Sequence, residues 1–269
     1  EHMQVPVRIY LETDPVLPEI EVAQGRKRTI DLLSAHTHHF TYGENLGAPD
    51  CGVPVGRFAY QQTRQPIVLD WWAAEPEPPP APTRFTTIGS WQQAGKDIEW
   101  NGETYHWSKH LEFLKFVDLP RRTAQPLELA LAGAGADVVR LLRSHGWHVA
   151  DALALSRDIT TYRDYILGSY GEFTVAKDQN IRLRSGWFSD RSACYLAAGK
   201  PVITQDTGFG NVLPTGRGLF AFRTMEDILA ALDVIGTDYS GNSRAARDVA
   251  ESHFAAERVV GDLRAKVGL

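Results

Sequence analysis

The residue types best suited to chemistry in this 269-residue chain gather around residues 186–208. Ser189 and Asp190 are N-capping residue types placed before an apolar stretch, so a helix with unpaired backbone N–H groups is expected to begin there. Such a helix end binds anions, above all phosphate, and Arg191 can add a forked, charge-assisted contact. The candidate anion site therefore comprises Ser189, Asp190, Arg191 and Ser192.

The residues that follow predict the helix and strand that hold this turn in place. Small and apolar residues 193–198 continue the helix, and Gly199 stands where a left-handed C-terminal cap is usual. Pro201 prevents the helix from continuing, and the β-branched residues 202–203 predict a short, buried parallel strand. In open α/β sheets, ligands bind at the carboxyl edge, where this strand ends.

Asp206, Thr207 and Gly208 form a polar turn at that edge, and two interpretations of it stay open. In one, the carboxylate of Asp206 accepts hydrogen bonds from two sugar hydroxyls. In the other, an Asp before Thr-Gly forms an Asx turn with its own backbone and contacts no ligand. All three residues are kept as candidate ligand-binding residues.

Two segments of this region, residues 186–192 and 205–208, read Gly-Trp-Phe-Ser-Asp-Arg-Ser and Gln-Asp-Thr-Gly. They resemble the donor-binding half of GT-B glycosyltransferases, in particular a group of actinobacterial-type members, most clearly over residues 173–222. The resemblance implies sugar transfer from a nucleotide-diphosphate sugar to an acceptor, with neither a metal ion nor a separate cofactor. It also implies that this region holds the nucleotide diphosphate and the sugar hydroxyls.

One position departs from the pattern of that family. Many retaining relatives place a glutamate in this helix to hold the ribose, and alignment on the Leu-Ala-Ala-Gly-Lys-Pro segment puts Cys194 there. A thiol cannot accept bonds from two ribose hydroxyls as a carboxylate does. The sequence thus leaves open the nucleotide base, the sugar, the acceptor, and whether the anomeric configuration is retained or inverted.

Two further turns are expected at the same edge of the sheet. A strand over residues 84–88 ends at Gly89 and Ser90, where glycine lets the backbone approach a phosphate and serine can donate to it. Trp91 follows in a predicted cleft loop, where its ring can stack on a sugar or a base. Lys177 ends another predicted strand and is expected to face the diphosphate, the alternative being an ordinary surface lysine.

An inverting glycosyl transfer needs a general base beside the acceptor. Asp14 and Glu44 each follow an expected strand near the N-terminus, and they are the candidate catalytic residues. His38 and His39 are adjacent, so in a strand they point to opposite faces and do not share an ion easily. No metal site is therefore expected.

The order of elements predicts an α/β protein with a Rossmann-like, doubly wound parallel sheet over residues 84–269, the C-terminal donor-binding domain. Residues 1–74 resemble the end of an N-terminal, acceptor-side Rossmann-like domain, which is expected to be truncated because a full GT-B enzyme has two such domains. Residues 75–83 are rich in proline and predict a stiff linker. An Asn-Gly pair predicts a β-hairpin over residues 98–105.

Composition limits the possible functions. The net charge of −5 argues against a nucleic-acid surface, and two cysteines provide neither a disulfide framework nor metal-ligand spacing. No apolar stretch reaches the roughly 18 residues of a membrane span, so a cytoplasmic protein is expected. The resemblance to GT-B glycosyltransferases implies a nucleotide sugar and an acceptor as partners and leaves the oligomeric state unspecified. A sugar-nucleotide epimerase and a non-catalytic nucleotide-binding or assembly module remain alternatives.

Overall fold

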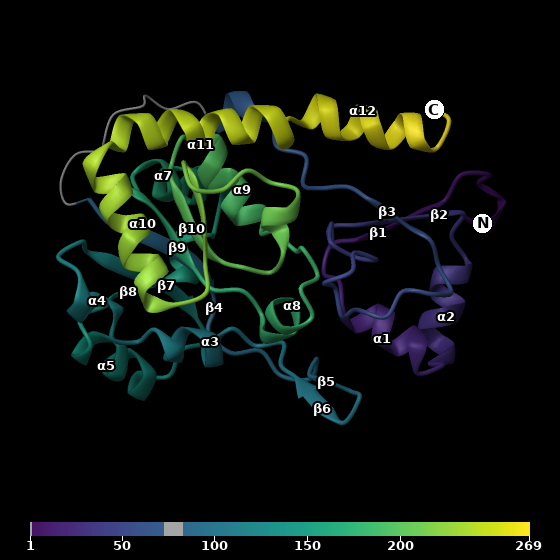
Figure 1. Ribbon diagram of the computed structural model, residues 1–269, viewed down its shortest axis with the longest axis horizontal. Helices are drawn as coiled ribbons and strands as arrows, with labels where there is room; N and C mark the ends of the chain where they lie inside the picture. The colour runs from purple at the N-terminus through teal and green to yellow at the C-terminus, as the bar shows by residue number, and fades with distance from the viewer. Residues whose placement is uncertain (1, 73–82) are drawn as a thin grey trace.

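The structure is a computed structural model, which describes residues 2–72 and 83–269. These two parts are called the N-terminal lobe and the C-terminal lobe, and each contains a parallel sheet (Figure 1). The predicted proline-rich linker, residues 75–83, falls outside the described residues except for residue 83.

The sheet of the C-terminal lobe has six parallel strands in the order β11-β10-β9-β4-β7-β8. Their bounds are β4 Phe85–Ser90, β7 Leu127–Ala132, β8 His148–Asp151, β9 Gly171–Thr174, β10 Val202–Gln205 and β11 Leu219–Phe222. Strands β7 and β8 are added on one side of β4, and β10 and β11 are added on the opposite side of β9. The strand order therefore reverses between the neighbours β4 and β9. This is the predicted doubly wound sheet, and the reversal marks the crevice where such folds bind ligands.

Helices cover both faces of this sheet (Figure 1). Their bounds are α3 His110–Lys115, α4 Leu119–Arg122, α5 Ala136–Ser144, α6 Ala152–Leu155, α7 Ile159–Leu167, α8 Asp178–Arg182, α9 Asp190–Ala197, α10 Met225–Thr237, α11 Tyr239–His253 and α12 Ala256–Lys266. Strands β9 and β10 are buried along their whole length, as expected for strands covered on both faces. In the core, the rings of Phe173 and Phe222 stack with centroids 5.5 Å apart.

The sheet of the N-terminal lobe has three parallel strands, β1 Ile9–Glu12, β2 His38–Thr41 and β3 Tyr60–Gln62, in that order. Helices α1 Leu17–Ala23 and α2 Lys27–Ser34 connect the first two strands. The strands that precede Asp14 and Glu44, β1 and β2, were predicted, whereas α1 and β3 were not. A 3₁₀ helix, Leu69–Trp72, follows β3 in this lobe.

Two elements of the C-terminal lobe reach across to the N-terminal lobe (Figure 1). The predicted hairpin consists of β5 Ile98–Trp100 and β6 Glu103–Tyr105, and its Glu99 carbonyl accepts a bond from Gln24 on the N-terminal lobe at 2.6 Å. Helix α12 extends over the smaller sheet, where Lys266 donates to the carbonyl of Gln62 at 2.9 Å. No helix within the described residues has the length and apolarity that crossing a bilayer requires.

Candidate functional site

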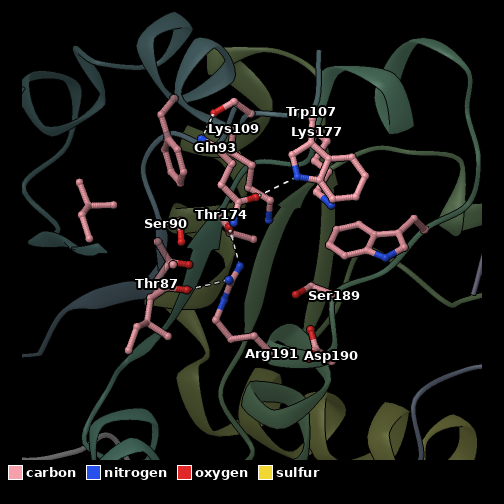
Figure 2. A pocket seen from close by; sticks show the side chains of 16 residues that line it. Thr87, Ser90, Gln93, Trp107, Lys109, Thr174, Lys177, Ser189, Asp190 and Arg191 are labelled. Carbon is pink, nitrogen blue, oxygen red and sulfur yellow. Dashed lines mark hydrogen bonds between the residues drawn. The ribbon is translucent and has the colours of Figure 1, made fainter. Parts of the chain in front are cut away.

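A cavity of about 180 Å³ lies at the carboxyl ends of β4 and β9, where the strand order reverses (Figure 2). We call it the switch-point cavity. The chemistry-bearing groups among its lining residues are Gly89, Ser90, Trp107, Lys109, Lys177, Trp187, Ser189, Asp190 and Arg191. Six of these were candidate ligand-binding residues from the sequence, and the fold brings them together from three separate segments.

Helix α9 presents its N-terminus to this cavity. Its N-cap, Ser189, is extended, with φ of −81° and ψ of 135°, and its side chain makes no capping bond. The N–H groups of the first turn, which begins at Asp190, are therefore not satisfied by a cap and are suited to an anion. Ser90, at the end of β4, lines the same cavity.

Lys177 lies in this cavity and is only 7% exposed. Its Nζ atom is 2.5 Å from Oδ1 of Asp14 and 3.2 Å from the ring centroid of Trp107. Burial lowers the pKa of the Lys177 ammonium, and the charge of Asp14 opposes that effect. Lys177 thus lines the cavity, with a carboxylate of the other lobe as its partner, and its contact with a diphosphate stays a prediction.

Lys109 is a cavity residue that the sequence analysis missed (Figure 2). Burial, together with the positive charges of Arg191 and Lys177, lowers the pKa of its ammonium to about 7. Its nearest aromatic contact is Trp187, with 5.2 Å from Nζ to the ring centroid, and within the described residues it forms no ion pair. In the sequence it is one lysine at the start of a short amphipathic helix, which does not distinguish it from a surface lysine.

Arg191 lies at the base of the cavity and is bound to the sheet. Its guanidinium donates to Oε1 of Glu172 at 2.6 Å, to the Ile88 carbonyl at 2.7 Å and to Oγ1 of Thr174 at 2.9 Å. Burial opposes its charge, but Glu172 raises the pKa of Arg191 above its usual value. These N–H groups of Arg191 already donate to residues of the sheet. The forked contact with a phosphate that the sequence led us to expect is therefore not preformed.

Five predicted ligand-binding residues do not line the cavity: Trp91, Ser192 and the three residues of the Asp206 turn. Trp91 is 4% exposed and packs in the core, where its ring stacks on Phe113 with centroids 6.1 Å apart. Ser192 is fully buried within α9. Trp91 and Ser192 each come directly after a residue that lines the cavity. Their side chains point away from the cavity because neighbouring side chains point in different directions in a strand and in a helix.

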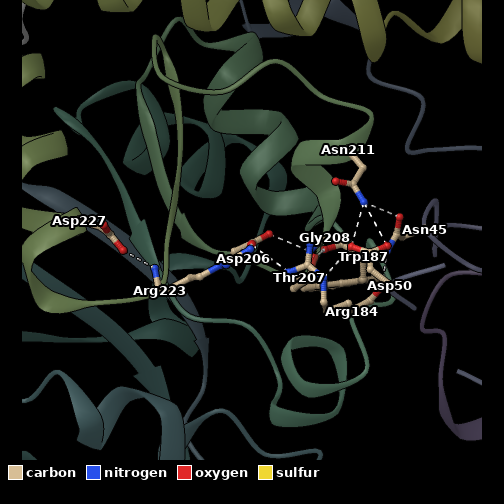
Figure 3. Close-up of polar contacts among 10 residues, drawn as sticks. All are labelled: Asn45, Asp50, Arg184, Trp187, Asp206, Thr207, Gly208, Asn211, Arg223 and Asp227. Atoms are coloured by element: carbon tan, nitrogen blue, oxygen red, sulfur yellow. Dashed lines mark hydrogen bonds and ion pairs between the residues drawn. The ribbon is translucent and has the colours of Figure 1, made fainter. Parts of the chain in front are cut away.

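The polar turn at Asp206 does not line the cavity, and its side chains bond within the C-terminal lobe (Figure 3). Oδ1 of Asp206 accepts from the N–H of Gly208 at 2.8 Å, which is the Asx turn, and Oδ2 accepts from Arg184 at 3.2 Å and Arg223 at 2.6 Å. Burial opposes ionisation, but these three donors lower the pKa of the Asp206 carboxyl. Thr207 donates to the Trp187 carbonyl at 2.6 Å.

The N-terminal lobe contacts the segment at residues 184–186 through Asn45 (Figure 3). Its side-chain amide donates to the Arg184 carbonyl at 2.9 Å, and its backbone N–H donates to the Ser185 carbonyl at 3.1 Å. Asp50 accepts from Arg184 at 2.8 Å. At Gly186, which has φ of 77°, an added Cβ would lie 2.4 Å from the Asn45 nitrogen. The lobes thus meet through backbone packed against backbone.

The two candidate bases lie in different places. Asp14 contacts Lys177, as described above, whereas Glu44 forms an ion pair with Arg64 and lines a separate cavity beside α12. Burial raises the pKa of Glu44, and the charge of Arg64 opposes that effect. Asp14 and Glu44 both follow a strand, but they do not lie in one cleft, because the Glu44 side chain points toward the C-terminal helices.

Comparisons with known proteins identify the fold. No protein-family model and no curated protein matches this sequence. Among solved structures, HepE from Anabaena, in complex with UDP and glucose, is similar at 10% identity and a TM-score of 0.60, covering 97% of this chain and 71% of HepE. Sucrose-phosphate synthase from Thermosynechococcus elongatus is similar at 11% identity and a TM-score of 0.57, covering 96% and 67%. The galactosyltransferase WaaB of the lipopolysaccharide outer core is similar at 13% identity and a TM-score of 0.52, covering 98% and 76%. This chain has the GT-B glycosyltransferase fold.

Proposed function

We propose that this chain takes part in glycosyl transfer and binds the diphosphate of a nucleotide-sugar donor in the switch-point cavity. The observation that carries the proposal is the meeting of Lys109 and Lys177 with the N-terminus of α9 around one cavity. In support, the similar protein HepE has been solved in complex with UDP and with UDP-glucose.

The cavity suits the diphosphate and not the whole donor. Its volume of about 180 Å³ is below the roughly 300–1,000 Å³ that a complete small-molecule ligand fills. The two lysines supply positive charge, and the first turn of α9 supplies N–H donors. In glycosyl transfer, negative charge develops on the departing diphosphate, and fixed positive groups stabilise it. The nucleoside and the sugar extend beyond this cavity.

We also propose that the transfer needs no divalent cation. Lys109 and Lys177 line the cavity and provide the charge that a cation would otherwise bring to the diphosphate. The check is activity after chelation with EDTA, with added Mg²⁺ and Mn²⁺ as the comparison. Activity that disappears with EDTA and returns with either ion contradicts this part of the proposal.

Asp14 is the proposed general base for an inverting transfer. It follows β1 and lies within 2.5 Å of Lys177, so it stands beside the proposed diphosphate site. Glu44, the other candidate, is bound to Arg64 in a separate cavity. We therefore assign the base role to Asp14 and a structural role to Glu44.

The first experiment is a calorimetric titration with UDP, GDP, ADP and dTDP. Lys109→Met and Lys177→Met are each expected to weaken binding of the preferred diphosphate at least tenfold, because each removes one charge from the cavity. Lys27→Met is the matched control, since Lys27 is an exposed lysine of the N-terminal lobe. If no diphosphate binds, or all three variants bind like the wild type, the proposal fails.

The same samples separate the alternatives. A glycosyltransferase releases nucleoside diphosphate from the donor in proportion to added acceptor, whereas an epimerase converts the sugar nucleotide without an acceptor. A binding or assembly module retains the donor unchanged.

A further inference from the structure

A second cavity, of about 510 Å³, lies between the lobes and adjoins the switch-point cavity. We call it the interlobe cavity. The two cavities share Trp187 and Asp190 as lining residues. Asp14, which lines the interlobe cavity, also contacts Lys177 of the switch-point cavity. A molecule in the interlobe cavity would therefore lie next to a donor whose diphosphate occupies the switch-point cavity.

The side chains of the interlobe cavity mostly accept hydrogen bonds. Each lobe contributes one carboxylate, Asp14 and Asp190, and among the described residues that line the cavity none is a lysine or an arginine. Gln65 is 4% exposed, and its Nε2 already donates to the Phe188 carbonyl at 2.7 Å. Its Oε1 is left without a partner in the described residues. A ligand that fits this lining must bring hydrogen-bond donors.

The cavity also offers a flat apolar face. The indole of Trp187 is held in place because its Nε1 donates to the Thr13 carbonyl at 3.0 Å. An indole face packs well against the C–H groups of a sugar ring, while carboxylates bind the hydroxyls at the ring edge. A volume of about 510 Å³ falls within the range of ordinary small-molecule sites. The combination suits a saccharide.

The charge of the cavity selects among saccharides. Asp14 and Asp190 attract an amino group and repel a carboxylate, phosphate or sulfate placed beside them. The neighbouring thiol of Cys194 adds no charge, because burial raises its pKa to about 12. Anionic sugars are therefore expected to bind in this cavity more weakly than neutral and amino sugars.

We propose that the interlobe cavity binds the acceptor and that the acceptor is a neutral or amino saccharide; this inference rests on the proposed function. In the transfer, a hydroxyl of that saccharide gives its proton to Asp14 and its oxygen bonds to the anomeric carbon of the donor. The bond from that carbon to the diphosphate breaks, and the nucleoside diphosphate leaves. Acceptors whose reacting ring carries a negative group are excluded.

The test uses sets of three ligands that differ only in charge: a methyl glycoside, its 2-amino analogue and its 6-carboxylate analogue, in the gluco, galacto and manno series. Binding is measured by saturation-transfer NMR titration on the full chain in the presence of the nucleoside diphosphate that binds best. In at least one series, the neutral and amino ligands are expected to bind at least tenfold more tightly than the carboxylate.

A charge variant shows whether the preference comes from this cavity. Asp190→Asn is expected to reduce the ratio of the neutral ligand's affinity to the carboxylate ligand's affinity at least fivefold. Asp31→Asn, which removes an exposed carboxylate of α2, is expected to leave this ratio of affinities unchanged. Equal binding of carboxylate and neutral ligands, no binding of any saccharide, or an unchanged ratio in Asp190→Asn overturns the inference.

Failure of the proposed function gives a different result. Calorimetry on the same protein reports nucleoside diphosphate binding independently of the saccharides. If the diphosphate does not bind, the proposed function itself fails. If it binds and the saccharides show no preference for neutral or amino rings, only the acceptor inference fails.

Discussion

The ammonium of Lys177 lies 2.5 Å from the carboxylate of Asp14, so one ion pair joins the proposed diphosphate lysine to the proposed general base. The two residues belong to different lobes, and Trp107, which follows β6 in the same lobe as Lys177, packs against the lysine. A diphosphate that enters the cavity competes with Asp14 for this lysine. Donor binding would thereby release the carboxylate for the acceptor.

Removal of the Asp14 charge is expected to separate binding from catalysis. In Asp14→Asn the diphosphate no longer competes with a carboxylate for Lys177, so nucleoside diphosphate affinity should stay equal or rise. Transfer should fall about 100-fold or more, because a general base contributes roughly that factor. Calorimetry and a transfer assay on one preparation check both parts. A variant that loses nucleotide binding contradicts the expectation.

The pKa of Lys109, lowered to about 7, makes donor binding depend on pH. The diphosphate favours the charged lysine, which the free protein progressively loses as pH rises above 7. Binding should therefore take up a proton, and affinity should fall by up to about tenfold per pH unit between pH 7 and the pKa of the bound state. Calorimetry in buffers of different ionisation enthalpy measures the proton uptake.

Lys109→Arg provides the matched comparison for that pH dependence. A guanidinium stays charged throughout this range, so the variant should bind the diphosphate with a flatter pH profile and a smaller proton uptake. Identical pH profiles for the wild type and this variant would show that another group titrates.

A pair of glycine substitutions measures the contact between the lobes. Gly186 and Gly133 have similar φ values, 77° and 72°, but only at Gly186 would a Cβ meet neighbouring backbone, 2.4 Å from the Asn45 nitrogen. Gly133→Ala should cost about 1 kcal/mol of unfolding free energy through its backbone conformation alone. Gly186→Ala should cost about 3 kcal/mol or more. Urea denaturation of both variants checks the difference, and equal losses would mean that Asn45 moves aside freely.

Buried carboxyl groups in the N-terminal lobe make stability depend on pH. Burial and the nearby Glu19 and Asp14 raise the pKa of Glu12 well above its usual value, and Glu12 is 2% exposed. The folded state thus keeps a proton that the unfolded chain loses near pH 4.3, so this contribution to stability falls as pH rises from there. Each unit of pKa difference corresponds to about 1.4 kcal/mol.

Glu12→Gln mimics the protonated side chain and tests that pH effect. Compared with the wild type, it should lose less unfolding free energy between pH 4.5 and pH 7.5 in urea titrations. Glu99→Gln, on the exposed face of the hairpin, should follow the wild type. If Glu12→Gln and the wild type lose the same amount, Glu12 is ionised in the folded protein.

Elements whose signals lie within a few residues of one another were predictable. The Asn-Gly pair forms the hairpin turn with positive φ at both residues, 52° at Asn101 and 79° at Gly102. Gly199 caps α9 with φ of 64°. Strand β3 was missed because Tyr-Gln-Gln has no apolar pattern, and it is a strand only through its pairing with β2. Helix α1 was missed because its N-cap is Val16, which is not an N-capping residue type and whose φ of 96° is unusual for a branched residue.

The sequence by itself determined the doubly wound sheet and the start of α9 after Ser189, because these depend on local patterns. Only the tertiary structure decided which side chains meet. It pairs Lys177 with Asp14, 163 positions away, and adds Lys109 to the same cavity. It also directs Trp91 into the core and Asp206 to Arg184 and Arg223 of its own lobe. A side chain's direction at the end of an element follows from register and long-range packing, which no local pattern encodes.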